Sequence, residues 1–499
     1  MTARRYWSVP LGATCLVLLT SCMVGPDYKR PDAPVPITYK ELDGWKPATP
    51  LDGIDRGAWW SIYHDPELDQ LESQVAVSNQ NVKSFEAAYR AAAALVRETQ
   101  AELFPTATVT PSVTRTKSGG GGGGVASSGA VVGGGGRGSI RTQYSIQGSA
   151  DWVPDFWGKI GRQVESNVAA AQVSAADLAN ATLSAQATLA IAYVNLRFED
   201  SLQKLLTDTV AQFQRALQIT QNQYHAGTAS SADVVTAQAQ LQTTQAQLIA
   251  VGVQRGQFEH AIAILTGHPP ADLTIPVAAL PRQVPVVPTD VPSTLLERRP
   301  DIAAAERQMQ QENALIGVAI SAYYPDVTLS AGLGLAGSTL SQLFTVANLA
   351  WSLGASATET IFDAGSRAAA VEVARATYDQ NVADYRQTVL TAFQQIEDEL
   401  VALRVLEQQA AAEDLAVASA RHAVEVTLNQ YLAGTVAYTS VITEQTQLLG
   451  DEQTALAIQQ SRLVASVTLI EALGGGWRAS DLPSDFAIKP KQLLPFPPP

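Results

Sequence analysis

Two short stretches of the chain are nearly identical: "NQYHAGT" at residues 222–228 and "NQYLAGT" at residues 429–435. The same offset of 207 residues matches four further landmarks, which are Gly158 with Gly365, Leu196 with Leu403, Arg197 with Arg404, and Gly267 with Gly474. Self-similarity at one fixed period is the sequence signature of a repeat architecture. The chain is therefore a tandem duplication, in which one structural unit is built twice.

A second offset relates the segments that precede these landmarks. "LFPTATVTPSV" (103–113) aligns with "YYPDVTLSAGL" (323–333) at an offset of 220, on the shared Pro105 and Pro325. Because the offset falls from 220 to 207 further along, the first copy holds thirteen residues that the second lacks. The run "GGGGGGVASSGAVVGGGG" (119–136) is the candidate, since this composition is that of a flexible linker. The sequence predicts a loop insertion there.

Long helices dominate the rest of each copy. The segments 158–224 and 365–431 contain no proline and have 67 positions each, which corresponds to roughly 100 Å of helix. Apolar side chains recur at spacings of three and four, as in a coiled-coil seam. In the second copy these are Tyr378, Val382, Tyr385, Val389, Phe393, Ile396, Leu400 and Leu403, and in the first copy Ala171, Ala175, Leu178, Leu189, Tyr193 and Leu196.

Each repeated turn is predicted to be the tip of a helical hairpin, with return helices at 230–266 and 437–473. Gly227 and Gly434 stand where the C-terminus of a helix favours a residue that can take a positive φ. The predicted tip residues are Tyr224, Ala226, Gly227 and Thr228 in the first copy, and Tyr431, Ala433, Gly434 and Thr435 in the second.

Four strands are predicted, two in each copy. A helix from Pro66 to Glu102 precedes the first, and apolar and polar residues then alternate at 106–114, 144–152, 327–335 and 349–357. One apolar face and one face of Ser, Thr, Gln and Gly are typical of an outer-membrane β-barrel; two hairpins of a soluble sandwich are the alternative. A sheet in lipid has no open edges, and single-chain barrels begin at about eight strands. If these strands lie in a membrane, several chains must share one barrel.

The N-terminus has the layout of a bacterial secretion signal. Arg4 and Arg5 precede an apolar run that ends in Leu-Thr-Ser-Cys, which resembles a lipobox and predicts a covalent lipid on Cys22. Cys15 would leave with the signal peptide, so the mature chain has one cysteine and no disulfide. An ordinary buried cysteine is the alternative interpretation of Cys22.

Composition and motifs argue against other function classes. The formal net charge of −14 disfavours a nucleic-acid partner, because phosphate binding needs a basic surface. The five histidines are scattered without the spacing of a metal site, and the glycine run lacks the Gly-Lys-Ser/Thr ending of a phosphate-binding loop. "QIEDEL" (395–400) is interpreted as a solvated or lumen-facing patch. We therefore expect no enzymatic activity, no metal and no cofactor apart from the lipid.

The chain is expected to divide into six segments. They are a lipoprotein signal peptide (1–21), an N-terminal lipid-anchored equatorial segment (22–65), the first repeat (66–267), a Pro-rich crossover (268–292), the second repeat (293–474) and a Pro-rich C-terminal equatorial tail (475–499). Each repeat has the same plan of helix, two strands, long helix, tip turn and return helix. The three Pro-rich segments are expected to pack together as a belt.

Several motifs resemble one family. They are the lipobox, "CMVGPDYKRP" (22–31), "WW" (59–60) before "DPELDQL" (65–71), "LLERRPDIAAAE" (295–306), "IFDAG" (361–365) and the twin tips. Together they resemble the outer membrane efflux protein family, the TolC-like channels, in the lipoprotein branch typified by OprM and NodT. The resemblance covers essentially the whole mature chain.

This resemblance implies a fold that is mainly α with a transmembrane β part. Three chains would form a homotrimer with a twelve-stranded β-barrel in the outer membrane of a Gram-negative bacterium and a long α-helical barrel across the periplasm. It further implies passive conduction of small molecules such as drugs, supplied by an inner-membrane pump of the resistance-nodulation-division class through a periplasmic adaptor that docks at the tips. A duct for type I protein secretion is the runner-up, and a structural trimeric coiled-coil lipoprotein is the alternative from a different class.

One departure from the family concerns the gate at the periplasmic mouth. Related channels commonly carry carboxylates just beyond the second tip, whereas here Val436, Ser440 and Thr443 occupy that stretch and Glu444 is the first acid. In the first copy, Asp233 matches Ser440 at the offset of 207. The candidate gate residues are therefore Asp233, Tyr431 and Glu444, with the alternative that Asp233 only caps the return helix.

Overall fold

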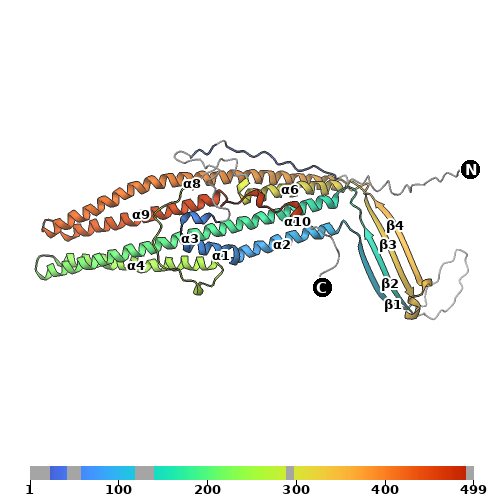
Figure 1. Ribbon diagram of the computed structural model, residues 1–499, viewed down its shortest axis with the longest axis horizontal. Helices are drawn as coiled ribbons and strands as arrows, with labels where there is room; N and C mark the ends of the chain where they lie inside the picture. The colour runs from blue at the N-terminus through green and yellow to red at the C-terminus, as the bar shows by residue number, and fades with distance from the viewer. Residues whose placement is uncertain (1–22, 37, 42–57, 118–139, 288–296, 490–499) are drawn as a thin grey trace, which may run out of the picture.

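The computed structural model describes residues 23–36, 38–41, 58–117, 140–287 and 297–489. The molecule is a long rod of helices with a small sheet at one end (Figure 1). Its elements are, in chain order, η1 (Trp59–Tyr63), α1 (Pro66–Ser78), α2 (Gln80–Ala101), β1 (Thr106–Lys117), β2 (Ile140–Trp152), α3 (Lys159–His225), α4 (Ser231–Leu265), η2 (Pro270–Asp272), α6 (Pro300–Ser321), β3 (Asp326–Gly337), α7 (Leu340–Leu343), η3 (Val346–Asn348), β4 (Leu349–Thr358), α8 (Ser366–Leu432), α9 (Tyr438–Ala472), η4 (Ala479–Asp481) and α10 (Asp485–Ile488).

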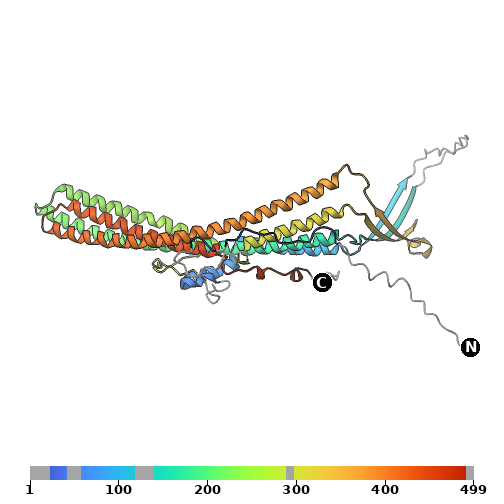
Figure 2. The same ribbon diagram turned by 90° about the horizontal axis from the view of Figure 1, so that it is seen from above.

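The duplication is visible in the lengths of matching elements. α3 and α8 have 67 residues each, α4 and α9 have 35 residues each, and both pairs are related by the offset of 207. α2 and α6 have 22 residues each and are related by the offset of 220. The long helices and their return helices are thus confirmed, and both hairpins point to the end of the rod opposite the sheet (Figures 1 and 2).

The single helix expected from Pro66 to Glu102 is wrong, because Asn79 divides it into α1 and α2. Asn79 has an extended backbone (φ −63°, ψ 125°), and its side-chain oxygen accepts hydrogen bonds from the N–H groups of Asn81 at 2.9 Å and Val82 at 3.2 Å. Its Nδ2 donates to the carbonyl oxygen of Leu265, the last residue of α4, at 2.9 Å. Asparagine competes with the helix for backbone groups in this way, so one residue ends α1, begins α2 and ties both to the first hairpin.

The four predicted strands are confirmed as one antiparallel sheet in the order β1-β2-β3-β4. The two copies meet at the β2–β3 pair, where Gly148 lies opposite Leu333. β1 and β4 are the two edges, and within the described chain each of them pairs with a single neighbour.

The main hydrophobic core lies along the middle of the rod and draws side chains from both copies. It includes Trp59 of the N-terminal region, Leu189 of α3, and Tyr385 and Ile396 of α8. The seam predicted on α8 is confirmed, because its residues from Tyr385 to Leu403 are buried there and Tyr378 and Val382 pack against them. α6 packs against both α3 and α8, so the two copies interlock. Among the described helices, none is both long and apolar enough to cross a membrane.

Candidate functional site

The first tip turn reverses the chain between α3 and α4. Ala226 is the C-cap of α3, and Gly227 has a φ of 78°, which residues with a Cβ rarely adopt. The N–H of Gly227 donates to the carbonyl of Tyr224 at 2.9 Å, and the N–H of Thr228 donates to the carbonyl of Gln223 at 2.9 Å. The hydroxyl of Thr228 donates to that same carbonyl at 3.1 Å. Gly and Thr together therefore satisfy the open carbonyls of the last helical turn.

The second tip repeats this geometry. Gly434 has a φ of 75°, and its N–H donates to the carbonyl of Tyr431 at 2.9 Å. The N–H and the hydroxyl of Thr435 donate to the carbonyl of Gln430 at 3.0 Å and 2.9 Å, while Ala433 is the C-cap of α8. The repeated heptapeptide thus encodes a repeated turn, which places two tips of the same shape at one end of the rod.

The two return helices begin differently. Ser230 and Asp233 form a capping box at the start of α4: the N–H of Asp233 donates to the Ser230 hydroxyl oxygen at 3.2 Å, and the Asp233 carboxylate accepts from the Ser230 N–H at 3.0 Å and from its hydroxyl at 2.8 Å. The matching position before α9 is Ala437, which provides no side-chain cap. Asp233 therefore caps α4, as the alternative interpretation predicts. Both accepted bonds use Oδ2, and the residue is partly exposed, so its charge still reaches the surroundings of the tip.

Tyr431 joins the two tips within the chain. Its hydroxyl donates a hydrogen bond to Oε1 of Gln223 on α3, and its ring lies 5.1 Å from the ring of Tyr438. Tyr438 is buried with Val441 and Ile442 in a small cluster that includes side chains of both hairpins. Burial raises the pKa of Tyr438 to about 12, and burial and then the charge of Asp233 raise the pKa of Tyr431. Both phenols therefore remain neutral at physiological pH.

The other predicted tip and gate residues lie outside this junction. Tyr224, which matches Tyr431, is half exposed and has its ring 5.8 Å from that of His225. Glu444 lies on α9 and is partly exposed, and among the described residues no hydrogen bond or ion pair joins it to Asp233 or Tyr431. The sequence reasoning missed Tyr438. Its signal was available, because an aromatic residue there replaces Ser231 at the offset of 207.

The sheet has one apolar face, most of which no other part of the described chain covers. Val109, Gly148, Leu333 and Trp351 lie directly opposite one another across the four strands and so share this face. Trp351 is 73% exposed and Leu353, two residues further along β4, is 76% exposed. A contiguous apolar patch of this kind marks a surface that contacts lipid or another protein.

The opposite face of the sheet is polar. Thr108 and Ser149 share a hydrogen bond of 2.8 Å across the β1–β2 pair, and Ser112 and Ser145 share one of 2.7 Å. Gln147 continues the same face between them. The sheet therefore separates an apolar side from a hydroxyl-rich side, which is the arrangement of a wall between lipid and water.

The start of the described chain lies where the sheet meets the helices. The N–H of Val24 donates to the carbonyl of Trp157 at 3.1 Å, and Nε of Arg162 donates to the carbonyl of Val24 at 3.1 Å. Trp157 stacks on Tyr324 at 4.8 Å, just before β3. Cys22 lies outside the described residues, as does the glycine-rich run at 119–136. Met23, its neighbour in sequence, packs against Gly158 at the start of α3.

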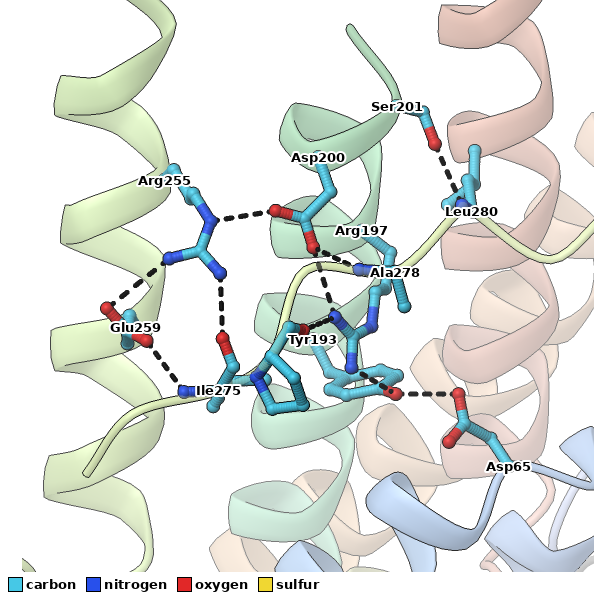
Figure 3. A network of polar contacts seen from close by, with 11 residues as sticks. Asp65, Tyr193, Arg197, Asp200, Ser201, Arg255, Glu259, Ile275, Ala278 and Leu280 are labelled. Carbon is cyan, nitrogen blue, oxygen red and sulfur yellow. Dashed lines mark hydrogen bonds and ion pairs between the residues drawn. The ribbon is translucent and has the colours of Figure 1, made fainter. Parts of the chain in front are cut away.

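A buried polar network fastens the Pro-rich crossover to the first hairpin (Figure 3). Asp200 of α3 accepts hydrogen bonds from Arg197 at 3.0 Å, from Arg255 of α4 at 2.7 Å and from the N–H of Ala278 at 3.1 Å. Arg255 also donates to the carbonyl of Ile275 at 2.8 Å. The N–H of Ala278 and the carbonyl of Ile275, both in the crossover, are thus satisfied by charged side chains of two helices.

The same network reaches the N-terminal region. Arg197 donates to the hydroxyl of Tyr193 at 2.9 Å, and that hydroxyl donates to Asp65, the N-cap of α1, at 2.6 Å. Arg404, which matches Arg197 in the second copy, pairs instead with Glu41 of the N-terminal segment. Each copy of the repeated Leu-Arg pair therefore holds a different Pro-rich segment, a role that the sequence reasoning did not assign to it.

Within the described ranges, no group of three or more His, Cys, Asp or Glu side chains could hold a metal ion. The candidate sites are therefore the twin tips, the two-faced sheet and the buried polar network that holds the Pro-rich crossover.

Comparison with known proteins agrees with this geometry. The sequence matches the family model for outer membrane efflux proteins over residues 71–268 and 291–475. It is 28% identical to the probable efflux pump outer membrane protein TtgC of Pseudomonas putida over 469 residues, which are 93% of this chain and 95% of TtgC. The solved structure of the outer-membrane channel OprN is 30% identical, with a TM-score of 0.82 over 91% of this chain and 100% of OprN. The CmeC outer membrane channel of Campylobacter jejuni, at 22% identity, has the same fold with a TM-score of 0.83, over 92% of this chain and 96% of CmeC. The chain, with its duplicated hairpins and four-stranded sheet, belongs to the outer membrane efflux protein family.

Proposed function

We propose that this protein is the outer-membrane channel of a tripartite efflux system, which passively conducts small molecules from an inner-membrane pump and its adaptor to the exterior. The observation that carries the proposal is the combination of a two-faced sheet at one end of the rod with paired hairpin tips at the other. Relatives such as TtgC are named as efflux pump outer membrane proteins, which supports the same function.

The open edges of the sheet favour a trimer. Four strands are too few to close a barrel, and unpaired backbone groups on β1 and β4 cannot face hydrocarbon. Three chains, each contributing four strands, would pair β4 of one chain with β1 of the next chain and so close a twelve-stranded barrel. Its apolar face would contact lipid, and its hydroxyl-rich face would line a water-filled lumen.

The twin tips favour docking of a six-part adaptor. A trimer would present six hairpin tips of nearly the same geometry around one mouth, and each tip exposes the side of a Gly-Thr turn. The tip residues from Tyr224 to Thr228 and from Tyr431 to Thr435 are the proposed contacts. The proposed pump is of the resistance-nodulation-division class, as the family resemblance implies.

The position of Met23 supports a lipid anchor on Cys22. Residue 23 packs where the sheet meets the helices, so a lipid on the preceding residue would enter the periplasmic leaflet beside the barrel. The anchor and the barrel would then place the protein at the same height in the membrane.

The test is purification of the full mature protein and its reconstitution in planar bilayers, together with deletion of the gene in its own host. We expect stepwise single-channel conductance, and increased susceptibility of the deletion strain to toxic small molecules. A structural lipoprotein would give no conductance. A duct for type I secretion would conduct but would alter the secreted proteins rather than drug susceptibility.

A further inference from the structure

The connection between β3 and β4, residues 338–348, is here called the rim loop. It folds onto the apolar face of the sheet. Gly337 lies on that face, because it is opposite Tyr144, which is itself opposite Val113. A Cβ atom placed on Gly337 would be 3.1 Å from the backbone nitrogen of Leu343. The backbone of α7 therefore covers the end of the apolar face, at the end of the sheet farthest from the helices (Figures 1 and 2).

The rim loop is held in shape by its own hydrogen bonds. The carbonyl of Gln342 accepts bonds from the N–H of Thr345 at 3.2 Å, from the Thr345 hydroxyl at 2.8 Å and from Nδ2 of Asn348 at 2.7 Å. The side-chain oxygen of Gln342 accepts a further bond from the Ser338 hydroxyl at 2.9 Å, and the side chain of Leu343, within the loop, is buried. The loop is thus a built element with a defined outer surface.

That outer surface is apolar. Leu340 is 62% exposed, Phe344 is 72% exposed and Val346 is 86% exposed. An ordered loop gains nothing from presenting three such side chains to water, since each would cost free energy in proportion to its exposed apolar area. The surface is continuous with the apolar face of the sheet, which indicates that both contact the same medium.

Two cationic side chains lie at the border of the apolar face, on β1 at the same end of the sheet. Arg115 and Lys117 are exposed and follow Val113 at intervals of two residues, so their side chains share its face. Within the part of the chain that the structure describes, neither side chain forms an ion pair. Arg141, by contrast, lies opposite Thr116 and belongs to the polar face. Long cationic side chains at the border of an apolar band reach the charged headgroups of lipids.

We propose that the rim loop, with Arg115 and Lys117, binds the outer leaflet of the membrane: Leu340, Phe344 and Val346 insert among acyl chains, and the two cations contact lipid phosphate groups. This inference rests on the proposed function, because it requires the sheet to lie in the outer membrane. The heights agree. From Val327 to Gly337 the strand spans about 33 Å, which at a tilt of about 40° is about 25 Å, the height of the apolar band of such barrels. The rim loop then lies at the outer border of that band.

The acyl contact can be tested with single-cysteine labels, because Cys15 leaves with the signal peptide and Cys22 carries the proposed lipid. Val346→Cys, Leu353→Cys and Thr110→Cys would each be labelled with a fluorophore and reconstituted in vesicles of phosphatidylcholine and phosphatidylglycerol that contain acyl-nitroxide lipid. We expect comparable quenching at positions 346 and 353, and much weaker quenching at position 110 on the polar face. Quenching at 353 without quenching at 346 would overturn the inference and indicate that the loop packs on a neighbouring copy. Absence of quenching at 353 would instead count against the proposed function.

The phosphate contact has its own matched pair of variants. Arg115→Gln combined with Lys117→Gln should reduce the phosphatidylglycerol that remains bound to the full protein in native mass spectrometry by several-fold. Arg141→Gln removes a charge from the same end of the sheet on the opposite face, and it should retain the lipid. Equal retention in the double variant and the wild type would show that the cations do not bind phosphate.

Discussion

Tyr431 is the residue on which closure of the periplasmic mouth is expected to depend. Its hydroxyl bonds to Gln223 of the other hairpin, and its ring packs on Tyr438. The hydrogen bond contributes about 1 kcal/mol, and an aromatic pair contributes a further 0.5–1.5 kcal/mol, roughly. Tyr431→Ala should therefore raise closed-state leakage, measured as bilayer conductance and as entry of a large antibiotic that the outer membrane normally excludes.

Tyr431→Phe keeps the ring and loses the hydroxyl, so its leakage should lie between that of the wild type and that of Tyr431→Ala. Tyr224→Phe is the matched control, since the hydroxyl of Tyr224 makes no hydrogen bond among the described residues and Tyr224 is half exposed. Unchanged leakage in both Tyr431 variants would contradict this role.

Asp233 is expected to act through its charge as well as through its cap. Three symmetry-related carboxylates around one axis repel one another and attract cations. Asp233→Asn retains an oxygen that can accept the Ser230 bonds but removes the charge, so it should lower cation selectivity in reversal-potential measurements. Ser230→Ala weakens the cap by about 1 kcal/mol and keeps the charge, so it should leave selectivity unchanged. If the cap variant alone changes selectivity, Asp233 is only a structural cap.

Glu72 provides a pH-dependent prediction. It is fully buried on α1, neither carboxylate oxygen has a hydrogen-bond partner among the described residues, and burial raises its pKa to about 9. Because the pKa is higher in the folded state than in the unfolded chain, Glu72 lowers the free energy of unfolding progressively as pH rises from 4.5 towards about 9. Glu72→Gln should therefore stabilise the protein by roughly 3 kcal/mol at pH 7 and by little at pH 4.5.

Thermal unfolding followed by circular dichroism at both pH values would measure the Glu72 effect. Glu98→Gln, at an exposed position of α2, is the control and should change the unfolding temperature little at either pH. A destabilised Glu72→Gln variant at pH 7 would mean that the carboxylate has a partner in the assembled protein.

At the scale of elements, the glycine-rich run between β1 and β2 should be dispensable. The β1–β2 ladder extends to the pair of Lys117 and Ile140, so deletion of residues 119–136 leaves Ser118 and residues 137–139 to connect the strands. Four residues suffice for a hairpin connection, and shortening a flexible loop changes its closure entropy by little. Trimers on native gels and drug efflux should both persist, whereas loss of the trimer would show that this run is a packed element.

Elements were predictable where a local pattern decides the structure. The absence of proline over 67 positions and the Gly-Thr turn predict α3 and α8 almost to the residue, and the period-two alternation predicts all four strands. The break at Asn79 was not predicted, because the capping tendency of asparagine decides a structure only when its side chain finds a tertiary partner, here the carbonyl of Leu265. The buried polar network of the Pro-rich crossover and the contact of Tyr431 with Gln223 likewise join residues far apart in sequence, which no local pattern reveals.

At the scale of the whole molecule, duplication allows one chain to differ at its two tips while keeping the same turn. The first return helix is capped by Ser230 and Asp233, and the second is held by the buried Tyr438. The conserved turn geometry would serve a partner that contacts all six tips alike, and the differences would serve contacts within the ring. A single unrepeated unit in a hexamer could not combine both.

The last prediction concerns how the whole molecule is anchored. Cys22→Ser should abolish acylation, because the thiol is the group that a lipobox presents for lipid attachment. The described residues that follow, 23–36 and 38–41, are bound to the helices by contacts such as those of Arg162 with Val24 and of Arg404 with Glu41. These contacts do not depend on the lipid. The sheet has its own apolar face, which would hold the proposed barrel in the membrane. We therefore expect slower signal processing and a modest loss of drug resistance, with trimers still present in the outer membrane. Incorporation of radiolabelled palmitate into the wild type but not into the variant would support the assignment, whereas equal incorporation in both would place the lipid elsewhere.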